Sequence, residues 1–301
     1  MSFRFTLSKI IKIIILVICF DSLNVLAIAQ TNENEIKVRY LGQGSLEGED
    51  KRNDYYVELL QTALARSGKH YTFEKGPRGL SGLRQLYAVA NGTVDVGWSL
   101  STEENEKVLA PIRIPIDKGL IGWRLLLINK DDTALFENVK SIEDLRQIRL
   151  GHGQDWTDTS ILRANQFNVE GVSTYEGIFK MLKQKRIRYF PRSILEISAE
   201  IEEHKDLDFS IESTLLIHYP AAIYFVVNPE KPLLAKDIES GLKAMIKDGK
   251  FNKLFEKYNA QSIKNANLNQ RHLYKLHNPY LPNATPINQS ELWFDVTQLQ
   301  K

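Results

Sequence analysis

The chain has 301 residues, of which 43% are apolar and 25% are charged, and its formal net charge is +2. This composition is typical of a globular protein with one or two hydrophobic cores. The near-neutral charge balance gives no sign of a nucleic-acid-binding protein or of a protein that binds polyanions, so we expect no nucleic-acid partner.

The N-terminal segment has the pattern of a secretion signal. Three basic residues within the first twelve precede a short apolar run at 13–20, and Ala27-Ile28-Ala29 has the small-x-small form of a cleavage site. The apolar run is too short to anchor the chain in a bilayer, and an uncleaved interfacial helix is the alternative interpretation. We therefore expect residues 1–29 to be a cleaved signal peptide and the mature protein to be periplasmic.

Cysteine usage excludes several kinds of chemistry. The single cysteine, Cys19, lies inside the predicted signal peptide. The mature chain would then have no disulfide, no thiol nucleophile and no metal site with cysteine ligands.

The residues that follow predict a β-α-β-α-β unit. Alternating or β-branched runs indicate strands, and apolar residues at helical spacing indicate the helices between them. This order favours a mostly parallel sheet with helices on its faces. The predicted strands are 36–41, 70–73 and 94–98, and the predicted helices are 55–66 and 79–91.

Two long apolar runs, 119–130 and 221–228, are typical of strands buried on both faces, with a buried helix segment as the alternative for such runs. We interpret them as crossover strands between two lobes. The chain would leave the first lobe on one run and return to it on the other.

Between the two runs the α/β pattern repeats. Ser141 and Asp144 have the spacing of a capping box at the start of a short helix. A proline-containing tail follows the last helix. Between the runs the predicted helices are 157–166, 174–184 and 193–203, and the predicted strands are 168–172, 186–190 and 207–211. Two further predicted helices, 234–247 and 251–258, follow the second run.

This organisation predicts an α/β protein with two lobes. Open α/β sheets bind ligands beyond the carboxyl ends of their strands, so two facing sheets predict a cleft between the lobes. A hinge motion about the crossover strands would close it. The predicted parts are lobe I (30–124 and 221–264), lobe II (125–220) and a C-terminal extension (265–301) packed on the body.

The stretches 95–103 and 247–251, with the order of elements over 36–258, resemble the extracellular solute-binding protein family 3. These are the type II periplasmic binding proteins, best known as polar amino-acid receptors of ABC transporters. The stretches 151–159, 186–192 and 278–282 look like a separate branch of that family. The resemblance implies a bilobal fold with a hinge, a small amino-acid-like ligand and a separate permease in the inner membrane.

Two positions depart from the family pattern. Receptors of amino acids carry an arginine shortly after the Ser-x-Ser turn, where it grips the ligand carboxylate, and this chain has Asn105 there. They also carry an aspartate in the second lobe for the ligand amine, where this chain has Arg188. Both anchors of an α-amino acid are therefore replaced.

The loop after the third strand supplies the first candidate ligand-binding residues, Trp98, Ser99 and Ser101. Serine hydroxyls form hydrogen bonds with a polar ligand, and an indole offers an apolar wall with one N–H donor. The alternative is that Trp98 lies in the core of the lobe.

A second candidate group is Asp155, Trp156 and Thr157, at the start of the predicted helix 157–166. Free backbone N–H groups and the helix dipole at such a position favour an anionic group. The alternative is that Asp155 or Thr157 only caps the helix.

Two arginines complete the candidate site. Arg192 follows the predicted strand 186–190, where a guanidinium would suit a carboxylate or a phosphate, and Arg78 precedes a helix in the first lobe. The alternative for Arg192 is a surface ion pair with Glu196. Tyr55 and Tyr56 are weaker candidates.

Catalytic patterns are missing from the sequence. The six histidines show no metal-ligand spacing, and there is no nucleophile elbow or phosphate-binding glycine loop. We therefore expect no enzyme activity, no cofactor and no metal.

The predicted function is a periplasmic, monomeric solute-binding protein that captures a small polar, anionic ligand and presents it to an ABC transporter. The alternatives are a sensing module for a membrane signalling receptor and a periplasmic dehydratase or lyase. The lyase would depend on Asp155 or His152 as its acid or base.

Overall fold

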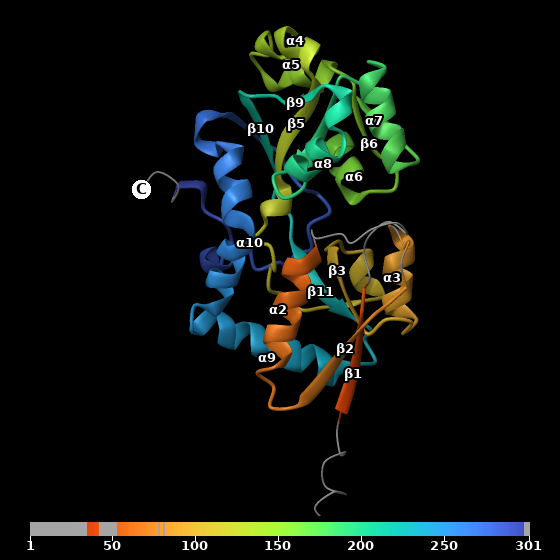
Figure 1. The fold of residues 1–301 in the computed structure, drawn as a ribbon, viewed down its shortest axis with the longest axis vertical. Helices are drawn as coiled ribbons and strands as arrows, with labels where there is room; N and C mark the ends of the chain where they lie inside the picture. Colours follow the sequence, from red (N-terminus) through yellow and green to blue (C-terminus); the bar gives the residue numbers. More distant parts are fainter. Residues whose placement is uncertain (1–34, 42–52, 78, 81, 298–301) are drawn as a thin grey trace, which may run out of the picture.

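The computed structural model describes residues 35–41, 53–77, 79–80 and 82–297. The predicted signal peptide, 1–29, and the candidate residue Arg78 lie outside the described residues. The described chain forms two α/β lobes stacked along the long axis of the molecule (Figure 1). The predicted two-lobed α/β fold is therefore confirmed.

The first lobe is built on a five-stranded sheet with the strand order β2-β1-β3-β11-β4. The helices α2 and α9 pack so closely that a side chain at Gly241 would meet the Ala63 carbonyl oxygen, 2.1 Å from an ideal Cβ. Its elements are β1 (Glu35–Tyr40), α2 (Asp54–Leu64), β2 (His70–Lys75), α3 (Leu83–Ala90), β3 (Val96–Leu100), β4 (Ala110–Pro111), β11 (Ile223–Val227), α9 (Pro232–Lys247) and α10 (Lys250–Ala266).

The second lobe is built on a seven-stranded sheet with the order β12-β10-β5-β8-β6-β7, and β9 pairs with β5 beside this path. The predicted capping box is confirmed at α5, where Ser141 and Asp144 bond to each other's backbone N–H. The elements are β5 (Trp123–Asn129), α4 (Thr133–Glu137), α5 (Ile142–Gln147), β6 (Leu150–Gly153), α6 (Thr157–Ala164), β7 (Val169–Val172), α7 (Tyr175–Lys183), β8 (Tyr189–Ser193), α8 (Ile197–Glu203), β9 (Phe209–Ile211), β10 (Leu215–His218) and β12 (His272–Lys275).

Both sheets are mixed rather than mostly parallel. The strands that follow the β-α-β pattern pair in parallel, as β1 does with β2 and β6 does with β7. The strands that return from the other lobe run antiparallel to their neighbours, as β11 does beside β3 and β5 does beside β8.

The two lobes are joined by short connections rather than by long crossover strands. All seven residues of β5 are buried, as its apolar run predicts, but β5 begins only at Trp123 because residues 120–122 form a 3-10 turn. The strand β5 therefore lies wholly in the second sheet, and β11 lies wholly in the first. Two of the connections, 112–122 and 219–222, are hydrogen-bonded to each other, since the Tyr219 N–H donates to the Gly122 carbonyl. A third connection, 267–271, leads from α10 to β12.

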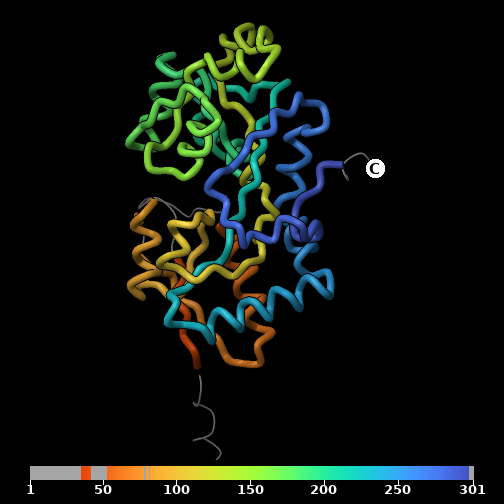
Figure 2. The backbone as a smooth tube through the Cα atoms, turned by 180° about the vertical axis from the view of Figure 1, so that it is seen from behind, coloured from red at the N-terminus to blue at the C-terminus, as the bar shows by residue number. Residues whose placement is uncertain are grey.

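The C-terminal extension contains a strand that the sequence did not predict. β12 pairs in parallel with β10 at the edge of the second sheet. The tail beyond it then crosses the back of the junction between the lobes, as Figure 2 shows. There Asn278 donates to the Pro220 carbonyl and the Phe294 N–H donates to the Lys118 carbonyl, each at 2.8 Å. The extension therefore contacts the connections 112–122 and 219–222.

Short 3-10 turns lie at Asn105–Lys107, Leu120–Gly122, Lys130–Asp132, Lys205–Leu207, Leu268–Gln270 and Ser290–Leu292. Within the described residues, no helix has both the length and the apolar character needed to cross a membrane.

Candidate ligand-binding cleft

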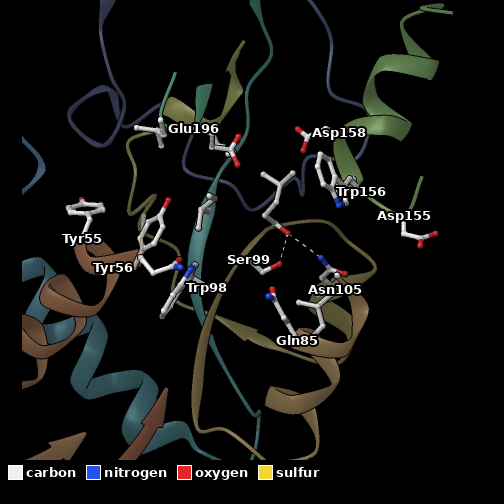
Figure 3. Close-up of a pocket in the computed structure, with 18 of the residues that line it drawn as sticks. Tyr55, Tyr56, Gln85, Trp98, Ser99, Asn105, Asp155, Trp156, Asp158 and Glu196 are labelled. Carbon is white, nitrogen blue, oxygen red and sulfur yellow. Dashed lines mark hydrogen bonds between the residues drawn. The ribbon is translucent and has the colours of Figure 1, made fainter. Parts of the chain in front are cut away.

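A cavity of about 490 Å³ is lined by residues of both lobes. The first lobe lines it with the N-terminus of α2, with α3, with the end of β3 and with one face of α10. The second lobe lines it with the N-terminus of α6 and the turn before α8. Figure 3 shows the labelled side chains of both lobes around this space.

The wall of the first lobe is aromatic. Tyr56 on α2 and Trp98 on β3 lie with their ring centroids 5.4 Å apart, and Trp98 meets Phe225 of the core edge-on at 6.4 Å. Trp98 is only 5% exposed, and its indole nitrogen has no hydrogen-bond partner among the described residues. Trp98 therefore serves both roles considered from the sequence, as a core residue and as part of the cavity wall.

Ser99, near the end of β3, lines the cavity, whereas Ser101, in the turn after β3, does not. The Ser99 hydroxyl and the Asn105 side-chain amide both donate to the Leu100 carbonyl oxygen, at 3.2 and 3.1 Å (Figure 3). The Ser101 hydroxyl instead donates to Glu106, and Ser101 does not line the cavity. Asn105 thus occupies the cavity at the turn where family receptors carry their arginine.

The wall of the second lobe is formed by the start of α6. Asp155, Trp156, Thr157 and Asp158 all line the cavity, and Trp156 is the N-cap residue without a side-chain cap bond. Neither Asp155 nor Thr157 is the N-cap residue. The Trp156 ring packs over Phe190, with their centroids 6.2 Å apart.

A buried ion network lies directly behind this wall. Arg124, 1% exposed, pairs with Asp158 and lies 3.7 Å from Glu196, and both carboxylates line the cavity. Burial acts to raise the pKa of Asp158, but Arg124 and the Tyr219 hydroxyl hold it below the ordinary value. Asp158 is therefore ionised at neutral pH.

Arg192 belongs to the same network and does not line the cavity. β8 continues to Ser193, so Arg192 lies inside the strand, opposite Leu125, rather than beyond its end. Its guanidinium pairs with Glu196 at 2.8 Å and with Glu200 at 2.5 Å. The ion pair with Glu196, considered as the alternative, is therefore present, but it is buried and not on the surface.

His152 lies behind Trp156 and is fully buried. The Thr159 hydroxyl donates to the Gly153 carbonyl, so it accepts the hydrogen on Nδ1 of His152 at 2.9 Å. Burial lowers the pKa of His152 to about 3, which keeps the ring neutral. A buried neutral ring that does not line the cavity offers no general acid or base to a bound ligand.

Other charged groups named in the sequence lie elsewhere. Arg188 pairs with Asp132 at 2.7 Å, on a part of the second lobe that does not line the cavity. Among the residues that the structure describes, no group of three or more His, Cys, Asp or Glu side chains could hold a metal ion.

Several cavity residues were missed from the sequence. Residues of α10 line the cavity because this helix runs to Ala266, eight residues beyond its predicted end at Tyr258. The sequence analysis names Glu196 only as a possible ion-pair partner of Arg192. The spacing of these two residues was the only feature of the sequence that drew attention to Glu196. The missed lining residues with polar side chains are Asn53, Gln85, Asp158, Glu196, Tyr258, Asn259 and Ser262.

Two α/β lobes joined by short connections are also the architecture of several solved structures. An ancestral arginine-binding protein bound to arginine has this fold, with a TM-score of 0.53 at 18% identity over 74% of this chain and 97% of its own. The GluR0 ligand-binding core from Nostoc punctiforme, in complex with L-glutamate, matches with a TM-score of 0.51 at 16% identity, over 73% of this chain and 98% of its own.

A third similar structure is a periplasmic binding protein of high arginine specificity from Salmonella typhimurium, with a TM-score of 0.54 at 12% identity over 74% of this chain and 99% of its own. No family model matches the sequence, and no curated protein matches it significantly. The similar structures confirm the fold that the resemblance to solute-binding protein family 3 implied.

Proposed function

We propose that this protein is an exported solute-binding protein that captures a small polar ligand between its lobes. The observation that carries the proposal is the cavity of about 490 Å³, bounded by Trp98 on one lobe and Trp156 on the other. A volume of this size suits a small molecule. Because each lobe supplies one wall, a bound ligand would favour the closed arrangement of the lobes.

The similar structures support the kind of ligand. The proteins named above are described as binding arginine or L-glutamate, which are small and polar. The sequence predicted that two arginines would bind an anionic ligand. One of them, Arg192, pairs with Glu200 and does not line the cavity. The size and polarity of the ligand are therefore retained in the proposal, and its charge is argued separately below.

The delivery step is part of the same proposal. A monomeric protein in the periplasm would present its ligand to a separate permease in the inner membrane. A membrane signalling receptor would use the same closed lobes, and no contact in the structure favours it over a permease. Of the two groups on which a lyase would depend, Asp155 lines the cavity and His152 is buried away from it. We do not propose a lyase, because the similar structures named above are binding proteins.

The experiment is to identify a ligand that the protein retains through purification, by native mass spectrometry followed by calorimetry. Tyr56→Ala removes one ring from the cavity wall, and Tyr87→Ala removes a ring from α3 that is 68% exposed. We expect Tyr56→Ala to lose the ligand and Tyr87→Ala to keep it. Equal affinity in both variants would refute binding in the cleft.

A further inference from the structure

We propose that the ligand is an organic cation, a primary amine or a guanidine that has no carboxylate group. This inference rests on the proposed function, because it concerns the ligand of the same cavity. It differs from the anionic ligand expected from the sequence and from a zwitterionic amino acid.

The first observation is the charge of the cavity wall. Three carboxylates, those of Asp155, Asp158 and Glu196, line the cavity from the second lobe. Among the lining residues that the structure describes there is no lysine, arginine or histidine. Within this described part of the lining, a ligand carboxylate would therefore meet like charges and no cation, and such contacts are unfavourable.

The second observation is that the buried arginines are already paired with carboxylates of the protein. Arg124 pairs with Asp158 and lies near Glu196, and Arg192 pairs with Glu196 and Glu200, so neither guanidinium is left over for a ligand carboxylate. His152 adds no positive charge, because burial keeps its ring neutral. Asp155, exposed at the rim, makes no ion pair within the described residues.

The third observation concerns the N-terminus of α6. Its free N–H groups and dipole would ordinarily attract an anion. Asp158 stands in the first turn of this helix, and Asp155 precedes it by three residues. The carboxylates of Asp155 and Asp158 therefore already compensate the positive end of the helix dipole. The helix N-terminus thus gives no reason to expect an anionic ligand.

The fourth observation is the aromatic lining. Tyr56, Trp98 and Trp156 offer ring faces or edges to the cavity, and an organic cation is attracted to the face of such a ring. The Trp156 ring already has one guanidinium, that of Arg192, at 5.1 Å from its centroid.

The experiment compares ligands that differ only in the carboxylate. Calorimetry would measure agmatine against arginine and cadaverine against lysine, with glutarate as the anion, at low and high salt. We expect each amine to bind about tenfold or more tightly than its amino acid, since one charge-assisted contact is worth about that factor. We expect glutarate not to bind, and high salt to weaken the binding of the amines.

Two isosteric variants locate the contact. Glu196→Gln and Asp155→Asn each remove one carboxylate of the cavity, and Glu203→Gln removes an exposed carboxylate of α8 outside it. We expect the first two to lower amine affinity about tenfold and the control to leave it unchanged. Asp155 is exposed and outside the buried network, so Asp155→Asn keeps the test valid if Glu196→Gln fails to fold.

The outcomes separate this inference from the proposed function. Tighter binding of the amino acids or of glutarate, or a retained ligand that is an anion, would overturn the cationic ligand and leave solute binding intact. A protein that retains no molecule and binds neither amines, amino acids nor glutarate would overturn both. A retained amine whose affinity falls in Asp155→Asn supports both.

Discussion

The two walls of the cavity are built on different physical principles. The first-lobe wall is aromatic, and its rings are the edge of the hydrophobic core, as Trp98 against Phe225 shows. The second-lobe wall carries charged groups that depend on buried arginines behind them, as Asp158 depends on Arg124. We therefore expect the stability of the first wall to depend on the volume of its buried rings. We expect the stability of the second wall to depend on the pairing of its buried charges.

The largest expected effect comes from breaking the charge balance of the second wall. Arg192→Met leaves Glu200, which is 0% exposed, without its guanidinium partner. We expect the free energy of unfolding, measured in urea, to fall by about 3–5 kcal/mol. The exposed pair Lys243–Glu239 is the control, because Lys243→Met should cost about 0.5 kcal/mol or less.

The double variant sharpens this prediction. Adding Glu200→Gln to Arg192→Met removes the buried charge that lost its Arg192 partner and should restore part of the lost stability. Equal stability of Arg192→Met and the wild type would show that the second wall does not depend on its buried ions.

The volume of the first wall is tested by a pair of tryptophan variants. Trp98→Ala leaves a cavity in the core and should cost about 3–5 kcal/mol of unfolding free energy. Trp156 is only partly buried, so Trp156→Ala should cost about 1–2 kcal/mol. Both variants should lose the ligand, because both rings line the cavity. If the two variants cost the same, the proposed contrast between the walls is wrong.

The contrast between the walls also explains what could be predicted from the sequence. The apolar runs and helical spacing gave the order of elements, because burial on a sheet or a helix imposes a local period. Trp98, Ser99 and the start of α6 follow from that order, since they lie at the ends of predicted elements. The sequence thus located five of the cavity's residues, namely Trp98, Ser99, Asp155, Trp156 and Thr157.

The charged network was not predictable in the same way. The predicted strand ends at Phe190, with Arg192 beyond it, and proline is indeed unusual inside a strand. β8 instead continues past the proline, with Arg192 opposite Leu125 of β5. The direction of the guanidinium depends on this pairing between distant segments and on Glu200 of α8, and no local pattern encodes either contact.

A buried carboxylate at the connection between the lobes gives the next prediction. Asp117 accepts from the Gly119 and Ile121 N–H groups at 3.1 and 2.9 Å, and burial raises its pKa from 3.8 to about 6. The folded state therefore holds the proton more tightly than the unfolded state, so this group's contribution to stability falls as the pH rises from about 4 to about 6.

The Asp117→Asn variant isolates this contribution. A shift of this size corresponds to about 3 kcal/mol, so the wild type should lose about that much relative to the variant between about pH 3 and about pH 7. Urea unfolding at several pH values checks it. His152, whose lowered pKa acts with the opposite sign, is present in both proteins and cancels in the comparison. Parallel stability curves for the two proteins would contradict the prediction.

The smallest expected effect concerns the tail on the back of the junction. The Trp293 ring lies against Gly119, where an added Cβ would come within 2.6 Å of it, and the neighbouring Phe294 N–H donates to the Lys118 carbonyl. Trp293→Ala should therefore loosen the connection 112–122 and cost about 1–2 kcal/mol of unfolding free energy. Tyr280→Ala, which removes an exposed ring of the same tail, is the control.

Hydrogen exchange separates loosening of the connection from a general loss of stability. In Trp293→Ala, the Gly122 N–H bonded to the Gly119 carbonyl should exchange faster, while the N–H groups of β1 should change only by the global loss. Such a result would mean that the tail restrains the connection 112–122, which also lines the cavity at Ile121. Unchanged exchange at Gly122 would mean that the tail covers the junction without restraining it, and that the two walls alone determine how the lobes close.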